Sequence, residues 1–376
     1  MKNSIIRSFV VLVFSTVIFS CKPEFKGVVI ESEKQRFGID TITTELINPW
    51  GMAFLPDGRI LVTERSGSIR VIQNGEMQES PLEGVPAVFA EGQGGLMEIK
   101  LHPDYENNGW IYLTYSKPGP DTTSSTTLAR AKIEGNRLIE LTELFNAKPW
   151  IVSDYHYGSR IAFDGAGHLF LTSGERGQRD SAQTLSNHFG KVIRLNEDGT
   201  IPSDNPFVNT PGALPEIWSY GHRNPQGLLF DTETRQLWDT EHGPMGGDEL
   251  NLVEPGKNYG WPVITYGINY DSTIISTLTE KEGMEQPVRY WKPSIATCGL
   301  MKVEGDRYPN WKSNYLVGAL AQMHVARVEL SDGKYVREER LLEKVGRVRY
   351  VAQDPDGIIY VATEGPGSLL KLVPLN

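Results

Sequence analysis

Five short segments of the chain carry more hydrogen-bonding side chains than strand ends and turns require. They read EGQGGL (91–96), YHYGSR (155–160), GHRNPQGL (221–228), EHGPMGGDELNLVEPGKNYGWP (241–262) and GRVRYV (346–351). Every segment contains glycine, which relaxes the backbone, and two also contain proline, which fixes it. Polar side chains held in this way are typical of binding loops on a rigid scaffold.

Three arginines in these segments favour an anion as the ligand. Arg223, Arg347 and Arg349 present planar guanidinium groups whose geometry suits carboxylates. Arg347 and Arg349 lie two residues apart on an expected strand, so their side chains point to the same face, although such a pair can also be an ordinary solvated strand face. The formal net charge of the chain is −10, which argues against nucleic acid as a partner because phosphate binding needs a basic face.

Neutral polar residues of the same segments add further chemistry. Asn224, Gln226 and Gln93 offer amides to carbonyls or hydroxyls. His156 is the one histidine of a small, polar stretch, and the ordinary pKa of histidine suits a general base. A lone histidine at a strand end is more often structural than catalytic, so these residue types alone do not establish an enzyme. The histidines of the chain form no HxH or HExxH pair, which argues against a zinc site.

The elements that must position these residues repeat along the chain. A module of apolar residues, a turn and a β-rich run occurs six times, with its turn at Asp57, Asp104, Asp164, Asp231, Asn310 and Asp356. Successive turns are 47, 60, 67, 79 and 46 residues apart, which leaves room for one four-stranded blade and variable loops in each interval. The sequence therefore predicts an all-β fold, a six-bladed β-propeller. Variable loops are expected around 117–127, 200–215 and 268–290.

The N-terminal residues read separately from the rest. Lys2 and Arg7 precede an apolar run that is too short to span a bilayer, and Cys21 follows a small residue. This pattern resembles a bacterial lipoprotein signal, in which Cys21 is lipidated; an ordinary secretory signal is the alternative. We expect a signal peptide at 1–21 and a single propeller domain at 22–376. The protein is then expected in the periplasm or cell envelope, with membrane contact only through a lipid anchor at Cys21, in the outer membrane rather than the inner.

Taken in order, the motifs resemble one family. They are similar to the soluble glucose/sorbosone dehydrogenases, also called aldose sugar dehydrogenases, which use pyrroloquinoline quinone (PQQ) on a six-bladed propeller. The resemblance runs from INPWGMAFLPDG (47–58) through GQGGL, HYGSR, GHRNPQGL, EHGP, GGDE and GKNYGWP to RVRY near the C-terminus. It implies oxidation of aldose sugars to lactones with transfer of hydride to PQQ. No motif specifies the electron acceptor that follows.

The resemblance also implies roles for single residues. The residues that would contact PQQ are Gln93, Arg223, Asn224, Gln226, Arg347 and Arg349. Arg347 and Arg349 would pair with carboxylates of PQQ, which is a tricarboxylate. His156 becomes the general base that takes the proton of the anomeric hydroxyl. The main-chain carbonyls of Gly243 and Pro244 would hold a Ca²⁺ ion that acts as a Lewis acid. A second, structural Ca²⁺ would be held by Glu249 and Tyr259.

One position departs from the family pattern. Family members usually carry a lysine that contacts the cofactor after the strand reading VGAL, and this chain has Ala321 there, with Gln322 and His324 as partial substitutes. Two other functions therefore stay open. The first is a propeller of the cell envelope that binds a partner or a glycan without catalysis. The second is a calcium-dependent lactonase, which would need metal-binding carboxylates in the channel rather than arginines.

Overall fold

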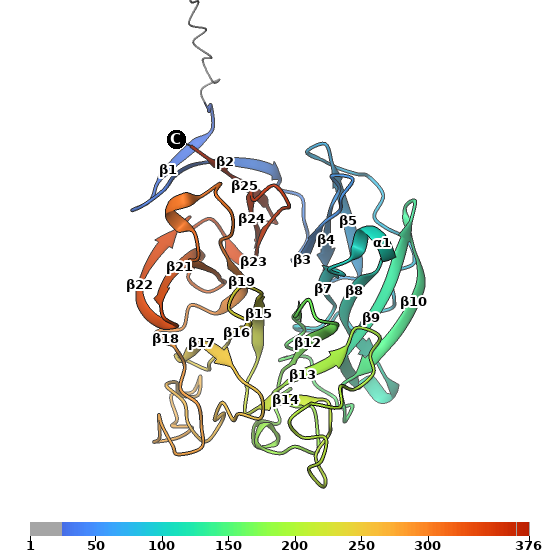
Figure 1. Ribbon diagram of the computed structural model, residues 1–376, viewed down its shortest axis with the longest axis vertical. Coiled ribbons are helices and arrows are strands. Elements are labelled where there is room, and N and C mark those ends of the chain that lie inside the picture. Colours follow the sequence, from blue (N-terminus) through green and yellow to red (C-terminus); the bar gives the residue numbers. More distant parts are fainter. Residues whose placement is uncertain (1–24, 366, 376) are drawn as a thin grey trace, which may run out of the picture.

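The computed structural model describes residues 25–365 and 367–375, and nearly all regular structure within them is β-strand. The strands of this part form six antiparallel sheets, arranged as blades around a central axis (Figure 1). The predicted six-bladed β-propeller is thereby confirmed. The signal peptide predicted at 1–21, including Cys21, lies outside the described residues. Within those residues, no helix is long and apolar enough to cross a membrane.

Each of the first three blades consists of four consecutive strands. The first blade contains β3 (Pro49–Phe54), β4 (Ile60–Glu64), β5 (Ser68–Gln73) and β6 (Glu76–Met77). The second contains β7 (Leu96–Leu101), β8 (Ile111–Pro118), β9 (Ser124–Glu134) and β10 (Arg137–Asn146). The third contains β11 (Ile161–Phe163), β12 (His168–Ser173), β13 (Lys191–Asn196) and β14 (Ile217–Tyr220).

The fourth and fifth blades follow the same order. The fourth contains β15 (Pro225–Asp231), β16 (Gln236–Glu241), β17 (Asp248–Val253) and β18 (Arg289–Trp291). The fifth contains β19 (Thr297–Lys302), β20 (Tyr315–Ala319), β21 (His324–Ser331) and β22 (Lys334–Leu341). Short helical turns lie in the connections of several blades: α1 (Tyr105–Asn108) and the 3₁₀ turns η1 (Pro120–Thr122), η2 (Arg179–Gln183) and η3 (Pro309–Trp311).

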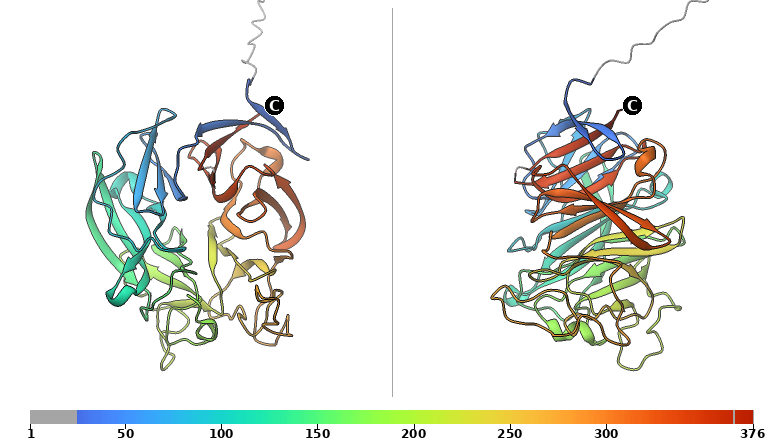
Figure 2. Two further views of the ribbon diagram at one scale, coloured as in Figure 1. Left: turned by 180° about the vertical axis from the view of Figure 1, so that it is seen from behind. Right: turned by 90° about the vertical axis from the view of Figure 1, so that its left-hand side faces the viewer.

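The sixth blade is built from both ends of the described chain. It contains β23 (Arg347–Gln353), β24 (Ile359–Glu364) and β25 (Leu369–Pro374), followed in the sheet by β2 (Arg36–Thr43) and β1 (Val28–Glu31). Phe37 pairs with Pro374, and Thr43 pairs with Leu369. Figures 1 and 2 show this blade joining the N-terminal strands to the C-terminal ones. The pairing ties the first and last blades into one ring, so that β25 has no free edge.

Five of the six turn residues counted in the sequence lie between the first and second strands of a blade, and the sixth, Asp231, is the last residue of the first strand β15. The long loops expected around 200–215 and 268–290 are present, between β13 and β14 and between β17 and β18. The loop expected at 117–127 is wrong in its extent. Strands β8 and β9 continue to within a few residues of each other, and paired strands occupy most of that range.

Buried apolar residues fill the spaces between the blades. In the described part of the chain, every pair of neighbouring blades shares a hydrophobic cluster. Because a blade is covered on both faces, its central strands are buried along their whole length, as in ILVTE at β4. This explains why apolar runs rather than alternating patterns marked the strands. The first strands of the blades pack against one another around the axis.

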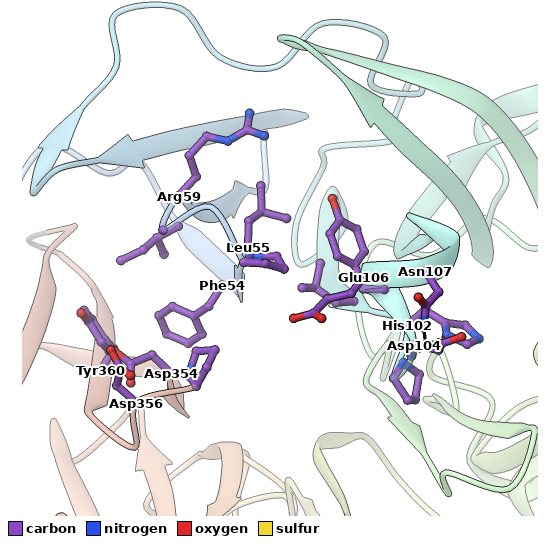
Figure 3. A pocket seen from close by; sticks show the side chains of 17 residues that line it. Phe54, Leu55, Arg59, His102, Asp104, Glu106, Asn107, Asp354, Asp356 and Tyr360 are labelled. Carbon is purple, nitrogen blue, oxygen red and sulfur yellow. Dashed lines mark hydrogen bonds between the residues drawn. The ribbon is translucent and has the colours of Figure 1, made fainter.

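Antiparallel order gives the ring two different mouths. The end of the ring that carries the turns between first and second strands is named the hairpin mouth. A cavity of about 570 Å³ opens there, lined in part by Phe54, Leu55, Asp104, Glu106, Asp354, Asp356 and Tyr360 (Figure 3). We call the loop mouth the opposite end, which carries the turns between second and third strands and the connections from one blade to the next. All five polar segments identified in the sequence reach the loop mouth or the channel beneath it.

Candidate functional site at the loop mouth

A histidine–glutamate pair stands at the loop mouth. His156 lies in the connection into β11, and its Nδ1 is hydrogen-bonded to Oε1 of Glu175, which follows β12. The backbone N–H of His156 donates to Oε1 of Gln93 (2.9 Å), so the connection from the first blade holds the histidine from the other side. His156 adopts a left-handed φ of 56°, which is uncommon for a residue other than glycine. Its Nε2 makes no hydrogen bond to a described residue.

Burial decides the protonation state of this histidine. Burial lowers the pKa of His156 to about 4, and the nearby charge of Arg223 acts in the same direction, while Glu175 opposes both. His156 is therefore neutral at pH 7. With Nδ1–H donating to the carboxylate of Glu175, the lone pair is on Nε2. A neutral imidazole with one nitrogen free in this way is able to act as a general base.

Arg223 and Asn224 lie beside this pair, in the connection into β15. Nη1 of Arg223 donates to the carbonyls of His242 (3.1 Å) and Gly243 (3.0 Å), while its Nε is buried without a partner. Oδ1 of Asn224 accepts the N–H of Gly158 (3.1 Å), two residues after His156. The GHRNPQGL segment thus ties the third blade to the EHGP turn of the fourth.

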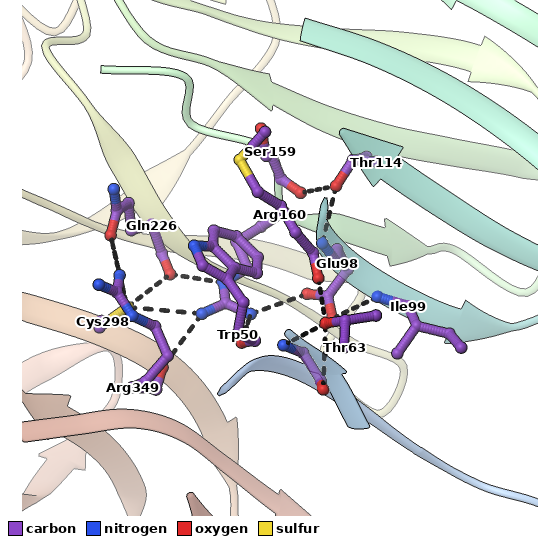
Figure 4. A network of polar contacts seen from close by, with 12 residues as sticks. Trp50, Thr63, Glu98, Ile99, Thr114, Ser159, Arg160, Gln226, Cys298 and Arg349 are labelled. Carbon is purple, nitrogen blue, oxygen red and sulfur yellow. Dashed lines mark hydrogen bonds and ion pairs between the residues drawn. The ribbon is translucent and has the colours of Figure 1, made fainter. Parts of the chain in front are cut away.

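A polar network of side chains from the inner strands lies in the channel (Figure 4). At its centre is Arg160, just before β11, whose guanidinium is 2% exposed. It donates hydrogen bonds to one residue from each of the other five blades, namely Trp50, Glu98, Gln226, Cys298 and Arg349. The ion pair with Glu98 spans 3.1 Å, and the guanidinium stacks on the indole of Trp50 at 3.8 Å. The network forms the floor of the loop mouth and fixes the inner strands relative to one another.

The predicted pair Arg347 and Arg349 shares one carboxylate but differs in environment. Arg349 is buried, with Nε 2.8 Å from Oε1 of Glu364 and Nη1 2.6 Å from Oε1 of Gln226. Arg347 is half exposed and makes only longer contacts, 3.3 Å to Oε2 of Glu364 and 3.5 Å to the carbonyl of Leu320. Burial alone would raise the pKa of Glu364, but the two arginines outweigh it and the pKa is lowered. Arg349 thus belongs to the floor, while Arg347 has free donors at the mouth.

A group of buried carboxylates lies behind the EHGP turn. Asp239, Glu241 and Glu249 surround the amide of Asn251, with Nδ2 to carboxylate oxygen distances of 3.1, 3.2 and 3.4 Å. Burial and the nearby charge of Glu241 raise the pKa values of Asp239 and Glu249 well above the ordinary range. Tyr259 lines the same small cavity as Glu241 and Glu249. Carboxyl groups so placed need protons or a cation.

Position 321 offers no cation in the folded chain. Ala321 follows β20 at the loop mouth, next to Leu320, whose carbonyl faces Arg347. The amide of Gln322 donates to the carbonyl of Ser294 (3.2 Å). His324 is fully buried, and burial lowers its pKa, so it is neutral at pH 7. Neither neighbour replaces a lysine.

The structure brings all the predicted site residues to one end of the channel. It also adds residues that sequence reasoning missed, chiefly Glu175, Arg160, Glu241 and Glu364. Glu175 stands in GERG, directly after the third module, and a search of the residues after each module for charged side chains would have found it. Several buried atoms at the mouth have no partner in the described structure: Glu175 Oε2, Arg223 Nε and His242 Nε2. Such atoms are expected where a polar ligand binds.

Comparison with known proteins gives consistent matches. Residues 46–371 match the family described as Glucose / Sorbosone dehydrogenase. The chain is 41% identical over 345 residues to aldose sugar dehydrogenase YliI of Escherichia coli (strain K12), covering 90% of this chain and 93% of that protein.

Solved structures agree with these matches. The apo-form of the soluble aldose sugar dehydrogenase from Escherichia coli superimposes with a TM-score of 0.87 at 39% identity, covering 90% of this chain and 100% of that one. A PQQ-bound aldose sugar dehydrogenase from Streptomyces coelicolor superimposes with a TM-score of 0.74 at 28% identity, covering 90% and 98%.

Proposed function

This chain belongs to the glucose/sorbosone dehydrogenase family, and on that premise we propose that it oxidises aldose sugars to lactones with PQQ as cofactor. The observation that carries the proposal is the neutral His156, held by Glu175 with Nε2 free, beside the guanidinium of Arg223. An anion site and a general base at one mouth are what oxidation of a neutral alcohol by an anionic cofactor requires.

The groups at the loop mouth suit PQQ. Arg347 and Arg223 have free N–H donors for carboxylates. The Oε1 of Gln93 accepts the N–H of His156, so its amide nitrogen is the group that is left for a ligand. Asn224 follows Arg223 and accepts the N–H of Gly158, and Gln226 and Arg349 support the site from the floor. When bound, PQQ supplies the two-electron acceptor for the hydride of the anomeric carbon.

His156 performs the proton transfer in this proposal. Nε2 accepts the proton of the anomeric hydroxyl, and Nδ1–H keeps its hydrogen bond to Glu175, whose negative charge stabilises the imidazolium that forms. Burial, and after it the charge of Arg223, disfavour that imidazolium before substrate binds, so the base starts neutral. Arg160 and its partners close the channel below and limit access of water from the hairpin mouth.

Calcium would bind at two places in this proposal. The carbonyls of Gly243 and Pro244 each accept one hydrogen bond, from Arg223 and from Ser294, which leaves one lone pair on each for an ion. There the ion would act as a Lewis acid. The second ion would be held by Glu249 and Tyr259, where a cation would balance the buried carboxylates.

The test uses the chain from residue 22 onward, purified without cofactor. Ca²⁺ and PQQ are added, and reduction of an electron-accepting dye is followed with a panel of aldoses. Saturable, sugar-dependent reduction is expected. Tight binding of PQQ without turnover of any sugar would contradict the proposed substrate class. Failure of a well-folded protein to bind PQQ would favour the non-catalytic binding propeller.

The place of action remains a separate proposal. We propose that the protein is exported and anchored by a lipid on Cys21 in the cell envelope, on the basis of the N-terminal sequence alone. Cell fractionation should recover the wild type with membranes and a Cys21→Ser variant elsewhere. Equal distribution of the two would contradict the anchor.

A further inference from the structure

Arg65, in the turn between β4 and β5, has a rigidly held backbone. Its carbonyl accepts the N–H of Leu96 (3.1 Å), and its own N–H donates to the carbonyl of Asn48 (3.2 Å). Gly95 approaches so closely that an added Cβ would lie 2.0 Å from the Arg65 carbonyl oxygen, and its φ is 138°. Only glycine fits there, so the GQGGL segment that also carries Gln93 fixes Arg65 at the loop mouth.

The fold places Arg65 among the site residues. It is the first residue after the second strand of its blade. The turn between the second and third strands also carries Glu175 in the third blade and His242 and Gly243 in the fourth. In the sixth blade, the second strand β24 ends at Glu364, directly before the corresponding turn. The first blade therefore contributes a guanidinium to a mouth in which the other blades contribute the base and the carbonyls.

The guanidinium of Arg65 lacks a protein partner. No hydrogen bond or ion pair joins it to another described residue, and its Nε is buried without a partner. Burial lowers the pKa of Arg65, and among the neighbouring charges Arg349 and Arg347 act in the same direction while only Glu364 opposes. Glu364 already pairs with Arg347 and Arg349. Three guanidinium groups thus lie near one carboxylate, which pairs with only two of them, and this leaves a local excess of positive charge.

We propose that Arg65 binds a carboxylate of the anionic cofactor from the first-blade side of the loop mouth. A neutral sugar needs no second cation there, whereas a polycarboxylate balances the excess charge and satisfies the free N–H groups. The inference rests on the proposed function, because that function supplies the polycarboxylate. It gives the mouth a cation that Ala321 does not provide.

The test compares Arg65→Gln and Arg65→Lys with the wild type, using two probes. PQQ binding in the presence of Ca²⁺ is measured by titration calorimetry, and the rise in melting temperature caused by propane-1,2,3-tricarboxylate is measured without Ca²⁺. We expect Arg65→Gln to weaken PQQ binding about ten- to a hundredfold. Arg65→Lys should recover part of that loss. The tricarboxylate should raise the melting temperature of the wild type and of Arg65→Lys but not of Arg65→Gln.

Arg59→Gln is the matched control, because Arg59 lies in the same blade but at the hairpin mouth, paired with Asp57. It should bind both probes like the wild type. Unchanged PQQ affinity in Arg65→Gln would overturn the inference while leaving the proposed function intact. An equal tricarboxylate effect in the wild type and Arg65→Gln would overturn it as well. If the wild type binds the tricarboxylate through Arg65 but not PQQ, the anion site stands and the proposed cofactor is wrong.

Discussion

The two mouths of the channel differ in the charge of the side chains around them. The hairpin mouth has a cavity of about 570 Å³, but carboxylates such as Asp104, Glu106 and Asp356 line it. At the loop mouth the guanidinium of Arg223 lies beside the neutral His156, and the guanidinium of Arg347 keeps free donors. A polyanion would be repelled at the first and attracted at the second. The sign of the surrounding charge, and not the size of a cavity, therefore distinguishes the candidate site for an anion.

Two histidine–glutamate pairs make the same contrast at the level of one side chain. His102, at the hairpin mouth, bonds Glu197 through Nε2 (2.9 Å) and receives hydrogen bonds from Asp104 N–H and Asn108 at Nδ1. Both of its ring nitrogens are occupied. His156 uses only Nδ1, for Glu175, and keeps Nε2 free. Both side chains are 12% exposed, so burial does not separate the structural histidine from the candidate base.

The largest expected effect comes from removing the free nitrogen. His156→Ala should lower kcat for sugar-dependent dye reduction by about 10²- to 10⁴-fold, the usual contribution of a general base. His102→Ala, at the other mouth, should keep kcat close to the wild-type value. Steady-state kinetics with PQQ-loaded proteins checks both. Similar losses in the two variants would mean that His156 is as structural as His102.

Substitution of the two arginines of the RVRY motif should affect the unfolding free energy and the affinity for PQQ differently. Arg349→Gln removes the buried partner of Glu364 and should cost about 3–5 kcal/mol of unfolding free energy. Arg347→Gln removes an exposed partner and should cost less than about 1 kcal/mol, yet weaken PQQ binding. Urea unfolding and titration calorimetry on both variants give the comparison. Equal losses of stability would show that the two side chains share one environment.

The pH dependence of stability should report the burial of His156. Its pKa is about 4 in the folded protein and about 6.5 when unfolded, so between these values only the unfolded chain binds the proton. The stability it contributes is present above pH 6.5 and is lost as the pH falls toward 4. His156→Asn, which tolerates the left-handed φ, should flatten the curve by up to about 1.4 kcal/mol per pH unit. Urea unfolding at pH 4.5–7 gives the unfolding free energy of both proteins as a function of pH. The same pH dependence in the wild type and in His156→Asn would contradict the low pKa of His156.

The smallest effect is expected at the hairpin mouth. A Glu106→Gln/Asp356→Asn double variant removes two exposed charges from the cavity wall. Because salt screens exposed charges beyond about 8–10 Å, PQQ affinity at the other mouth should change by less than about twofold. Calorimetry at physiological ionic strength measures it. A larger change would mean that the field of the hairpin mouth reaches the site.

Sequence alone determined the blade count and the identity of most candidate site residues. The turn module recurs because each blade must reverse the chain between its first two strands, by a short turn at Asp57 and Asp356 and by longer connections at Asp104 and Asn310. The site motifs were readable because glycine and proline fix short loops locally. Blade closure by β2 was not readable, since β-pairing between Phe37 and Pro374 leaves no local signature.

Tertiary structure decided which charges are free. Arg347 and Arg349 look alike in the sequence. In the structure, Arg349 contacts Gln226 and Glu364 in the channel floor, whereas Arg347 faces the mouth. Arg65 carried no signal in its own segment and gains its significance from the lack of a partner. Such differences depend on contacts that bring together residues as far apart in the chain as Arg349 and Gln226, because the electrostatics of a side chain are set by what surrounds it in space rather than along the chain.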